Sequence, residues 1–141
     1  MGVGKLRITG YKDALESKED FFIANSAKKE SLKEKLKDLL LNKKVDALLC
    51  SDFESTMMTY RLAYENGINI PKDLKVIGFI NGGLAGYLTP SISYVNQNPE
   101  KIGESAMNIL SKRINNHSDL PIKTLTIDTE IVHLESTGNL N

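Results

Sequence analysis

The sequence predicts an α/β fold in which helices alternate with the strands of a parallel sheet. Short apolar runs such as "VDALLC" and "KVIGF" have the length and composition of buried strands. Longer amphipathic stretches separate these runs, and each is long enough to carry the chain from one parallel strand to the next. Because such βαβ units build parallel sheets with right-handed crossovers, this alternation defines the expected architecture.

The first part of the chain predicts a helix, a strand and a second helix. Residues 5–18, "KLRITGYKDALESK", carry apolar side chains at near-helical spacing. "DFFIAN", over residues 20–25, is a brief apolar run that we interpret as a buried strand. Residues 28–42 then predict a surface helix, because one face is apolar and the opposite face carries lysines and glutamates.

The next strand and helix are marked by a capping signal. "VDALLCS" predicts a buried strand over residues 45–51. Ser51 and Glu54 follow at the capping-box spacing, in which each side chain binds a backbone N–H at the start of a helix. This helix is expected to run to about Asn66, where Gly67 ends it.

A third strand, residues 76–79, is followed by a glycine-rich loop. In "INGGLAG" we expect a tight turn in which Gly82 and Gly83 adopt positive φ, and no helix. "SISYVNQ" then alternates like a strand, and residues 99–115 predict a helix that opens with Pro99. "KTLTIDTEIVHL" predicts one or two closing strands.

Composition favours a soluble chain that forms one domain or a large part of one. In 141 residues, 18 Lys and Arg balance 18 Asp and Glu, so no net charge draws the chain to nucleic acid or to an anionic membrane. The single cysteine, Cys50, cannot form an internal disulfide, which favours a reducing compartment. The chain lacks an apolar run near the roughly 18 residues of a membrane span and shows no secretory signal, so we expect a cytoplasmic protein.

The sequence predicts no catalytic residue, cofactor or metal. His117 and His133 stand apart from any arrangement of Ser, Cys or carboxylate groups that the sequence can assemble. One cysteine and two distant histidines are not a metal-ligand set. The glycines of "INGGLAG" match no phosphate-binding spacing. A small α/β enzyme that uses Asp52 or His133 is the alternative.

Polar side chains follow the predicted parallel strands at their carboxyl ends, where open α/β sheets bind ligands. Asn25 follows the first strand, Ser51 and Asp52 follow the second, and Asn81 follows the third. Helix capping or turn formation would also explain Ser51, Asp52 and Asn81. The positions alone therefore predict the rim of a small-molecule site, with local structural roles as the alternative.

Two further side chains have the chemistry of ligand contacts. Arg7 offers five planar donors to hydroxyl or carboxylate groups, although a solvated charge at a helix start is an equal alternative. Gln97 carries both a donor and an acceptor, and it ends the extended segment before the helix at Pro99.

Several segments together resemble a known family of regulators. "VDALLCSD", "YENGINIPKDLKVIGF", "LAGYLTPSISYVNQNPEKIGESAMNIL" and "EIVHLESTG" are similar, in order and spacing, to the effector-binding domain of lac-repressor-family (LacI/GalR) transcription regulators. "RITGYKDAL" resembles the R-x-x-G-[FYW] helix of that family. The resemblance implies a three-layer αβα lobe of the periplasmic-binding-protein-like type I fold. It also implies a small-molecule effector that alters DNA binding by a helix-turn-helix outside this chain.

The resemblance divides the chain between the two lobes of such a domain. Residues 5–90 are expected in the second lobe, and residues 91–98 in a crossover through the hinge. Residues 99–128 would belong to the first lobe, most of which lies outside this chain, and residues 129–138 would form the strand that returns.

The resemblance also implies roles for individual residues. Arg7, Ser51 and Gln97 match pocket positions, and Asn25 lies near another; with Asp52 and Asn81 they form the expected effector site. The chain departs from the family pattern at Ile80, where many members place an aspartate that accepts hydrogen bonds from effector hydroxyls. We therefore expect a sugar-like or nucleobase-like effector, with an atypical effector or a protein signal as the alternative.

Homodimers are implied as well, through the helix after "CSD" and the loop before "TP". The expected interface residues are Met57, Met58, Leu84, Tyr87 and Leu88, although the methionines could instead fill gaps in the core. A periplasmic-type sugar-binding protein with the same architecture is the first alternative function.

Overall fold

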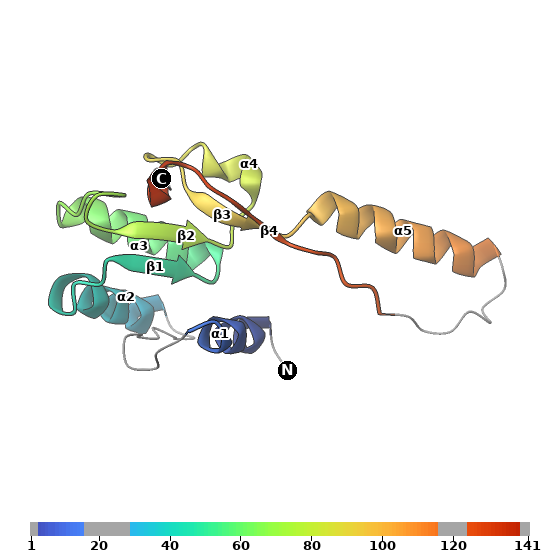
Figure 1. Cartoon of the computed structure of the whole chain (residues 1–141), viewed down its shortest axis with the longest axis horizontal. Coiled ribbons are helices and arrows are strands. Elements are labelled where there is room, and N and C mark those ends of the chain that lie inside the picture. The colour runs from blue at the N-terminus through green and yellow to red at the C-terminus, as the bar shows by residue number, and fades with distance from the viewer. Residues whose placement is uncertain (1–2, 16–28, 116–123, 139–141) are drawn as a thin grey trace.

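The structure, a computed structural model of the 141-residue chain, describes residues 3–15, 29–115 and 124–138. Its sheet has the strand order β1-β2-β3-β4, with β1 at Ala47–Cys50, β2 at Lys75–Gly78, β3 at Ser93–Asn96 and β4 at Glu130–Val132 (Figure 1). The first three strands pair in parallel, as expected for βαβ units. The closing strand β4 runs antiparallel to β3, because the chain returns to the sheet from the far side of the last helix.

The helices that the apolar periodicity predicts are α1 (Val3–Asp13), α2 (Lys29–Lys37) with a π-helical extension (Asp38–Asn42), α3 (Phe53–Glu65) and α5 (Pro99–Asn115). Two short helices were not predicted: α4 (Gly82–Ala85) and the 3₁₀ helix η2 (Glu135–Thr137). The α/β fold class is therefore confirmed. The strand predicted over residues 20–25 lies outside the described residues.

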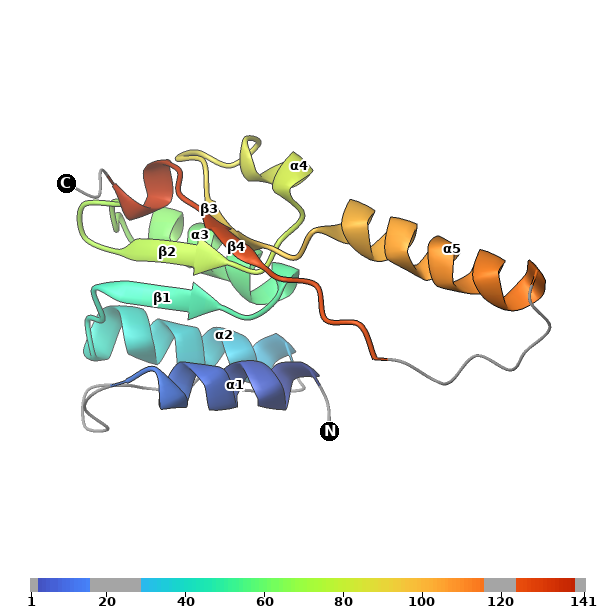
Figure 2. The same ribbon diagram turned by 45° about the vertical axis from the view of Figure 1, so that its right-hand side comes forward.

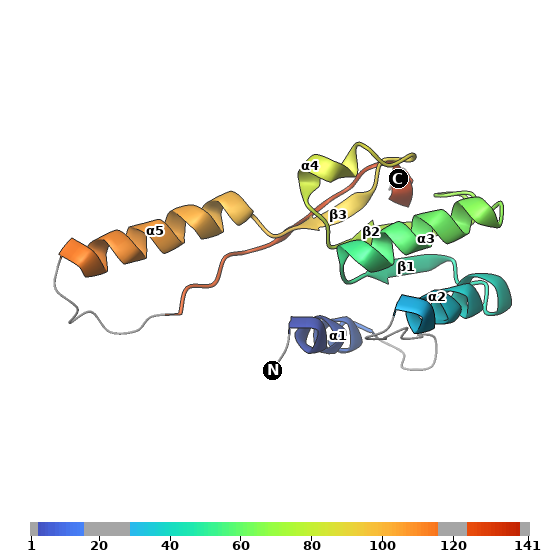
Figure 3. The same ribbon diagram turned by 180° about the vertical axis from the view of Figure 1, so that it is seen from behind.

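One apolar core joins the sheet to α2 and α3. The buried residues that form it are Leu32, Leu36, Leu40, Cys50, Leu62, Leu74, Val76, Ile80, Ala85 and Ile92. Helix α3 packs so closely on this face that a Cβ added at Gly78 would lie 2.9 Å from Thr56 Oγ1. Figure 3 shows α3 lying across the sheet on the side away from the viewer of Figure 1.

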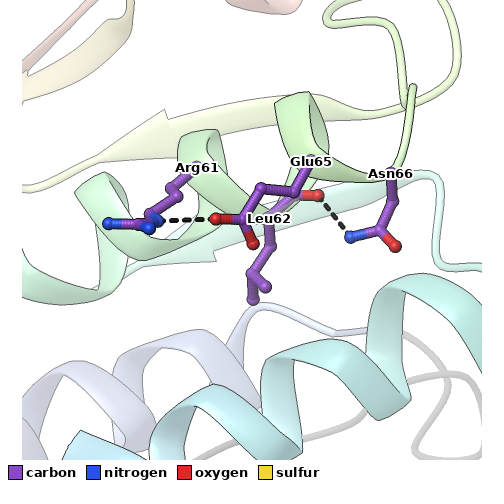
Figure 4. Close-up of polar contacts among 4 residues, drawn as sticks. All are labelled: Arg61, Leu62, Glu65 and Asn66. Carbon is purple, nitrogen blue, oxygen red and sulfur yellow. Dashed lines mark hydrogen bonds and ion pairs between the residues drawn. The ribbon is translucent and has the colours of Figure 1, made fainter.

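The start of α3 differs from the prediction, whereas its end agrees with it. Asp52, rather than Ser51, is the N-cap, because its Oδ1 accepts the Ser55 N–H at 2.8 Å. The capping-box prediction for Ser51 and Glu54 is therefore wrong by one position. At the other end Asn66 is the C-cap, and its Nδ2 donates to Leu62 O at 2.7 Å (Figure 4). Gly67, with φ of 67°, ends the helix as predicted.

The glycine-rich loop also differs from its prediction. Asn81 Oδ1 accepts the Gly83 N–H at 2.9 Å and begins the short helix α4, so Gly82 and Gly83 do not adopt positive φ. Gly82 is required for a different reason, since a Cβ there would lie 2.7 Å from Tyr94 Cζ. The loop therefore folds back onto β3 instead of turning freely.

Helix α5 projects away from the sheet and is joined to it by two extended segments (Figures 1 and 2). None of its residues is buried. Its apolar side chains are exposed, including Ile102, Met107, Ile109, Leu110 and Ile114. Within the described ranges, no helix is long and apolar enough to cross a membrane.

Candidate functional site

The carboxyl ends of the three parallel strands meet at one edge of the sheet, which we call the carboxyl edge. Ser51 directly follows β1, Phe79 directly follows β2, and Gln97 directly follows β3. The Phe79 N–H donates to Cys50 O at 3.0 Å, which extends the pairing of β1 and β2 by one residue and holds Phe79 in place. Sequence-distant side chains therefore converge because parallel strands end together.

Arg7 of α1 reaches this edge and contacts all three strand ends. Its Nη1 donates to Ser51 O, and its Nη2 donates to Gln97 Oε1 at 2.9 Å. The guanidinium carbon lies 4.1 Å from the centroid of the Phe79 ring, which is cation–π geometry. The structure therefore brings together three of the six predicted effector-site residues, Arg7, Ser51 and Gln97.

Asp52 and Asn81 lie beside these residues but have structural tasks. Asp52 Oδ1 caps α3, and its Oδ2 accepts the Ser51 hydroxyl at 3.3 Å. Asn81 Oδ1 caps α4. Ile80 is only 5 % exposed and belongs to the core, so its side chain offers nothing to a ligand.

One predicted effector-site residue, Asn25, lies outside the described residues, and so does His117, for which no role was predicted. His133 directly follows β4, and its side chain is exposed. Where the chain is described, no cluster of three or more His, Cys, Asp or Glu side chains could hold a metal ion.

Phe79 is the site residue that sequence reasoning missed. It was assigned to the end of the third strand as an apolar core residue, yet its side chain is half-buried and stacks under the guanidinium of Arg7. The available signal was its position, since an aromatic residue immediately after a parallel strand lies at the ligand-binding edge.

The crossing between the sheet and α5 is braced by side-chain hydrogen bonds. Asn96 Nδ2 donates to Glu130 Oε1 at 2.9 Å, across the β3–β4 pair. Asn98 Nδ2 donates to Asp128 O at 2.8 Å, and Asn98 itself adopts φ of 50°, the left-handed conformation that Asn tolerates. Gln97 lies between these two asparagines, so the Arg7 contact is made at the crossing itself.

Cys50 lies just inside the carboxyl edge and is an unreactive core residue. Burial raises the pKa of its thiol to about 11, partly offset by hydrogen bonds from hydroxyls that include Thr59 at 3.5 Å. A thiol that stays protonated is a poor nucleophile, so Cys50 contributes packing to the site and no chemistry.

The predicted dimer residues lie on two elements. Met57 and Met58 are half-buried on α3, and Met58 packs against the core. Leu84 of α4 is 43 % exposed, and Tyr87, just beyond it, is 84 % exposed. Leu88 is half-buried and packs against the core.

Comparison with known proteins relates the chain to one family. The sequence profile of the periplasmic binding protein-like domain matches residues 4–137. The lactose operon repressor of Rhizobium radiobacter is 33 % identical over 94 residues, which cover 67 % of this chain and 81 % of that protein. The HTH-type transcriptional regulator MalR of Clostridium butyricum is 27 % identical over 146 residues, which cover 99 % of this chain and 43 % of that protein.

Among solved structures, the fold is similar to that of a LacI family transcriptional regulator from Enterococcus faecium with bound ribose. The TM-score is 0.81 at 21 % identity, with 97 % of this chain and 52 % of that chain covered. The chain therefore spans about half the length of such proteins. The curated relatives are transcription regulators and not enzymes, which confirms the prediction that this chain is not an enzyme.

Proposed function

The chain belongs to the periplasmic binding protein-like domain family, in its lac-repressor (LacI) branch, and from this premise we propose that it senses an effector for a bacterial transcription regulator. The effector is a small sugar-like or nucleobase-like molecule, and its binding changes the affinity of the whole protein for DNA. The DNA is contacted by a helix-turn-helix outside these residues, so the protein acts in the cytoplasm.

A single observation carries this proposal: Arg7 joins the ends of three parallel strands to the crossing that leads to α5. Its contacts to Ser51, Phe79 and Gln97 make the sheet edge and the crossing one connected unit. A ligand that binds Arg7 acts directly on Gln97, which is the first residue of the chain beyond β3. Differential binding to two arrangements of the crossing is the mechanism by which such a ligand shifts a conformational equilibrium.

We propose an assignment of the parts of the chain to the two lobes of the domain, based on the family to which the chain belongs. Residues 5–90 form the second lobe, residues 91–98 cross the hinge, residues 99–128 belong to the first lobe, and residues 129–138 return. The exposed apolar side of α5 and its separation from the sheet support this assignment. The brace between Asn96 and Glu130 gives the two crossing segments a fixed register.

Homodimerisation is the second part of the proposal. Leu84 and Tyr87 expose large apolar surface on and beside α4, and Met57 and Met58 lie on α3. With Leu88, these residues are the proposed contacts to a second copy, because aromatic residues and methionine are enriched at interfaces. Sedimentation of the wild-type chain and of Tyr87→Ser would test it: the variant should shift the equilibrium towards monomer.

Ligand screening tests the proposed function. We expect a sugar, sugar derivative, nucleobase or nucleoside to raise the melting temperature, since a ligand that binds only the native state stabilises it. Arg7→Ala should abolish the shift. Arg61→Ala, which removes an exposed arginine of α3 that pairs with Glu65, is the matched control and should retain it. If no member of any class shifts folded protein, the proposed function is wrong.

A further inference from the structure

Side-chain acceptors at the carboxyl edge are already engaged within the protein. Gln97 Oε1 accepts from Arg7, and Asn81 Oδ1 accepts from the Gly83 N–H. The two carboxylate oxygens of Asp52 accept from the Ser55 N–H and the Ser51 hydroxyl. Each of these oxygens therefore already has one donor within the protein, which is one of the two hydrogen bonds that it can accept.

Side-chain donors at the same edge remain available. The guanidinium of Arg7 has five N–H donors, and its hydrogen bonds to Ser51 and Gln97 leave the others without a partner among the residues that the structure describes. The amide nitrogens of Gln97 and Asn81 likewise donate no hydrogen bond within these ranges. The described part of the edge thus offers several unused donors around the guanidinium of Arg7.

The charge of Arg7 has no carboxylate partner among the residues that the structure describes. Ion pairs within the described ranges join Lys37 to Glu34 and Arg61 to Glu65, so no described carboxylate lies within 4.0 Å of the guanidinium of Arg7. Its partners are a backbone carbonyl, a side-chain amide and an aromatic ring, all of them neutral. Ile80 is apolar and buried, so the strand end beside Phe79 supplies no carboxylate either.

We propose that the effector carries an oxyanion, a carboxylate or a phosphate group, that binds the guanidinium of Arg7. This inference rests on the proposed function and narrows its ligand class. An oxyanion accepts from several of these unused donors at once and needs to donate to none, whereas each hydroxyl of a neutral sugar also carries a proton that needs an acceptor. The planar fork of arginine matches the paired oxygens of a carboxylate or phosphate.

The arrangement explains how such a ligand would reach the crossing. An oxyanion that takes the particular Nη2 N–H now held by Gln97 Oε1 replaces that oxygen as its partner. The Gln97 amide is then free to turn its nitrogen towards the same oxyanion. The Phe79 ring, whose centroid lies 4.1 Å from the guanidinium carbon, gives Arg7 a further contact that does not depend on Gln97.

The inference is tested on the wild-type chain with pairs of ligands that differ only in an anionic group. Each neutral hexose is compared with its 6-phosphate and with its uronate by titration calorimetry and by the Arg7 Nε–H resonance in NMR spectra. We expect the anionic member to bind more tightly by roughly tenfold or more. Its affinity should fall as salt is added, because the added attraction is electrostatic.

Variants separate charge from geometry. Arg7→Gln should remove the advantage of the anionic member, and Arg7→Lys should keep part of it, because lysine retains the charge without the fork. Arg61→Gln should leave the affinity advantage of the anionic member unchanged. Each variant is first shown to be folded by circular dichroism.

The outcomes distinguish this inference from the proposed function. Tighter binding of a neutral sugar than of its anionic partners would overturn the inference and leave the sensor function standing. An anionic preference that survives Arg7→Gln would overturn it too. Failure of every sugar, phosphate, uronate and nucleobase to bind folded chain would overturn both.

Discussion

Arg7 and Gln97 lie 90 positions apart in the sequence and are joined by a 2.9 Å hydrogen bond from Nη2 to Oε1. This contact ties the first described helix to the point where the chain leaves the sheet. Because Arg7 also contacts Ser51 and Phe79, a change at any of the three strand ends is transmitted to the guanidinium.

The stacking of Arg7 on Phe79 is expected to be measurable as a coupling energy. In a double-mutant cycle with Arg7→Gln and Phe79→Leu, urea unfolding should give a coupling of about 0.5–1 kcal/mol, the range for a cation–π pair that is partly exposed. A cycle that pairs Phe79→Leu with Arg61→Gln is the control and should give none. Zero coupling in both cycles would mean that the ring does not hold the guanidinium.

Gly78 is expected to be intolerant of a side chain. An alanine Cβ would lie 2.9 Å from Thr56 Oγ1 and 3.0 Å from Ile92 Cδ1, both of them buried. Gly78→Ala should therefore lower the free energy of unfolding by about 1–3 kcal/mol.

Gly103 provides the matched control for that substitution. It lies within α5 with no neighbouring atom within 4 Å of an added Cβ. Gly103→Ala should be neutral or mildly stabilising, because alanine favours helix over glycine. Equal destabilisation by both changes would contradict the packing of α3 on β2.

The N-cap of α3 can be assigned by substitution. Asp52→Ala should reduce the free energy of unfolding by about 1 kcal/mol, because the Ser55 N–H loses its acceptor. Asp52→Asn should retain most of the stability, since asparagine also caps. If Ser51→Ala lowered the free energy of unfolding more than Asp52→Ala did, Ser51 would be the N-cap.

Ser136 is expected to anchor the C-terminal segment to the sheet. Its hydroxyl is fully buried, donates to Val76 O at 2.6 Å and accepts the Ser93 N–H at 2.8 Å. Ser136→Ala leaves both backbone groups without these partners and should cost about 1–3 kcal/mol in chemical denaturation. Ser111→Ala, at an exposed position of α5, should have little effect.

Stability should fall in mildly alkaline solution because of Cys50. Burial raises the pKa of its thiol from the ordinary 9.0 to about 11, so above pH 9 the unfolded chain loses a proton that the folded chain keeps. The free energy of unfolding should decrease between pH 9 and 11. Burial raises the pKa of Tyr60 from 10.0 to about 12, so the decrease between pH 9 and 10 belongs chiefly to Cys50. In Cys50→Ala the free energy of unfolding should change little between pH 9 and 10. The same decrease in the variant as in the wild type would show that Cys50 does not cause it.

Some features of this protein follow from short stretches of sequence. The alternation of apolar runs with amphipathic stretches predicted β1, α3, β2 and α5, because periodicity and capping signals act over a few residues. The family resemblance was carried by motifs of the same local kind. Ser51 was predicted as a site residue because parallel strands end at one edge. Gln97 was predicted because its amide both donates and accepts hydrogen bonds at the end of the extended segment.

Other features depend on which segments pack together. Gly82 is required by the ring of Tyr94, a residue on another element. The stacking of Phe79 under Arg7 is likewise a contact between distant segments.

The sequence by itself determined the class of fold, the order of its elements and the polar character of the strand ends. Tertiary structure decided which polar atoms at those ends are already engaged and which remain available. The physical reason is that a hydrogen bond needs both partners in place: Gln97 Oε1 has its donor because Arg7, 90 positions away, reaches the end of β3, and the other donors of Arg7 are left for a ligand. That distribution exists only after residues far apart in the chain have met.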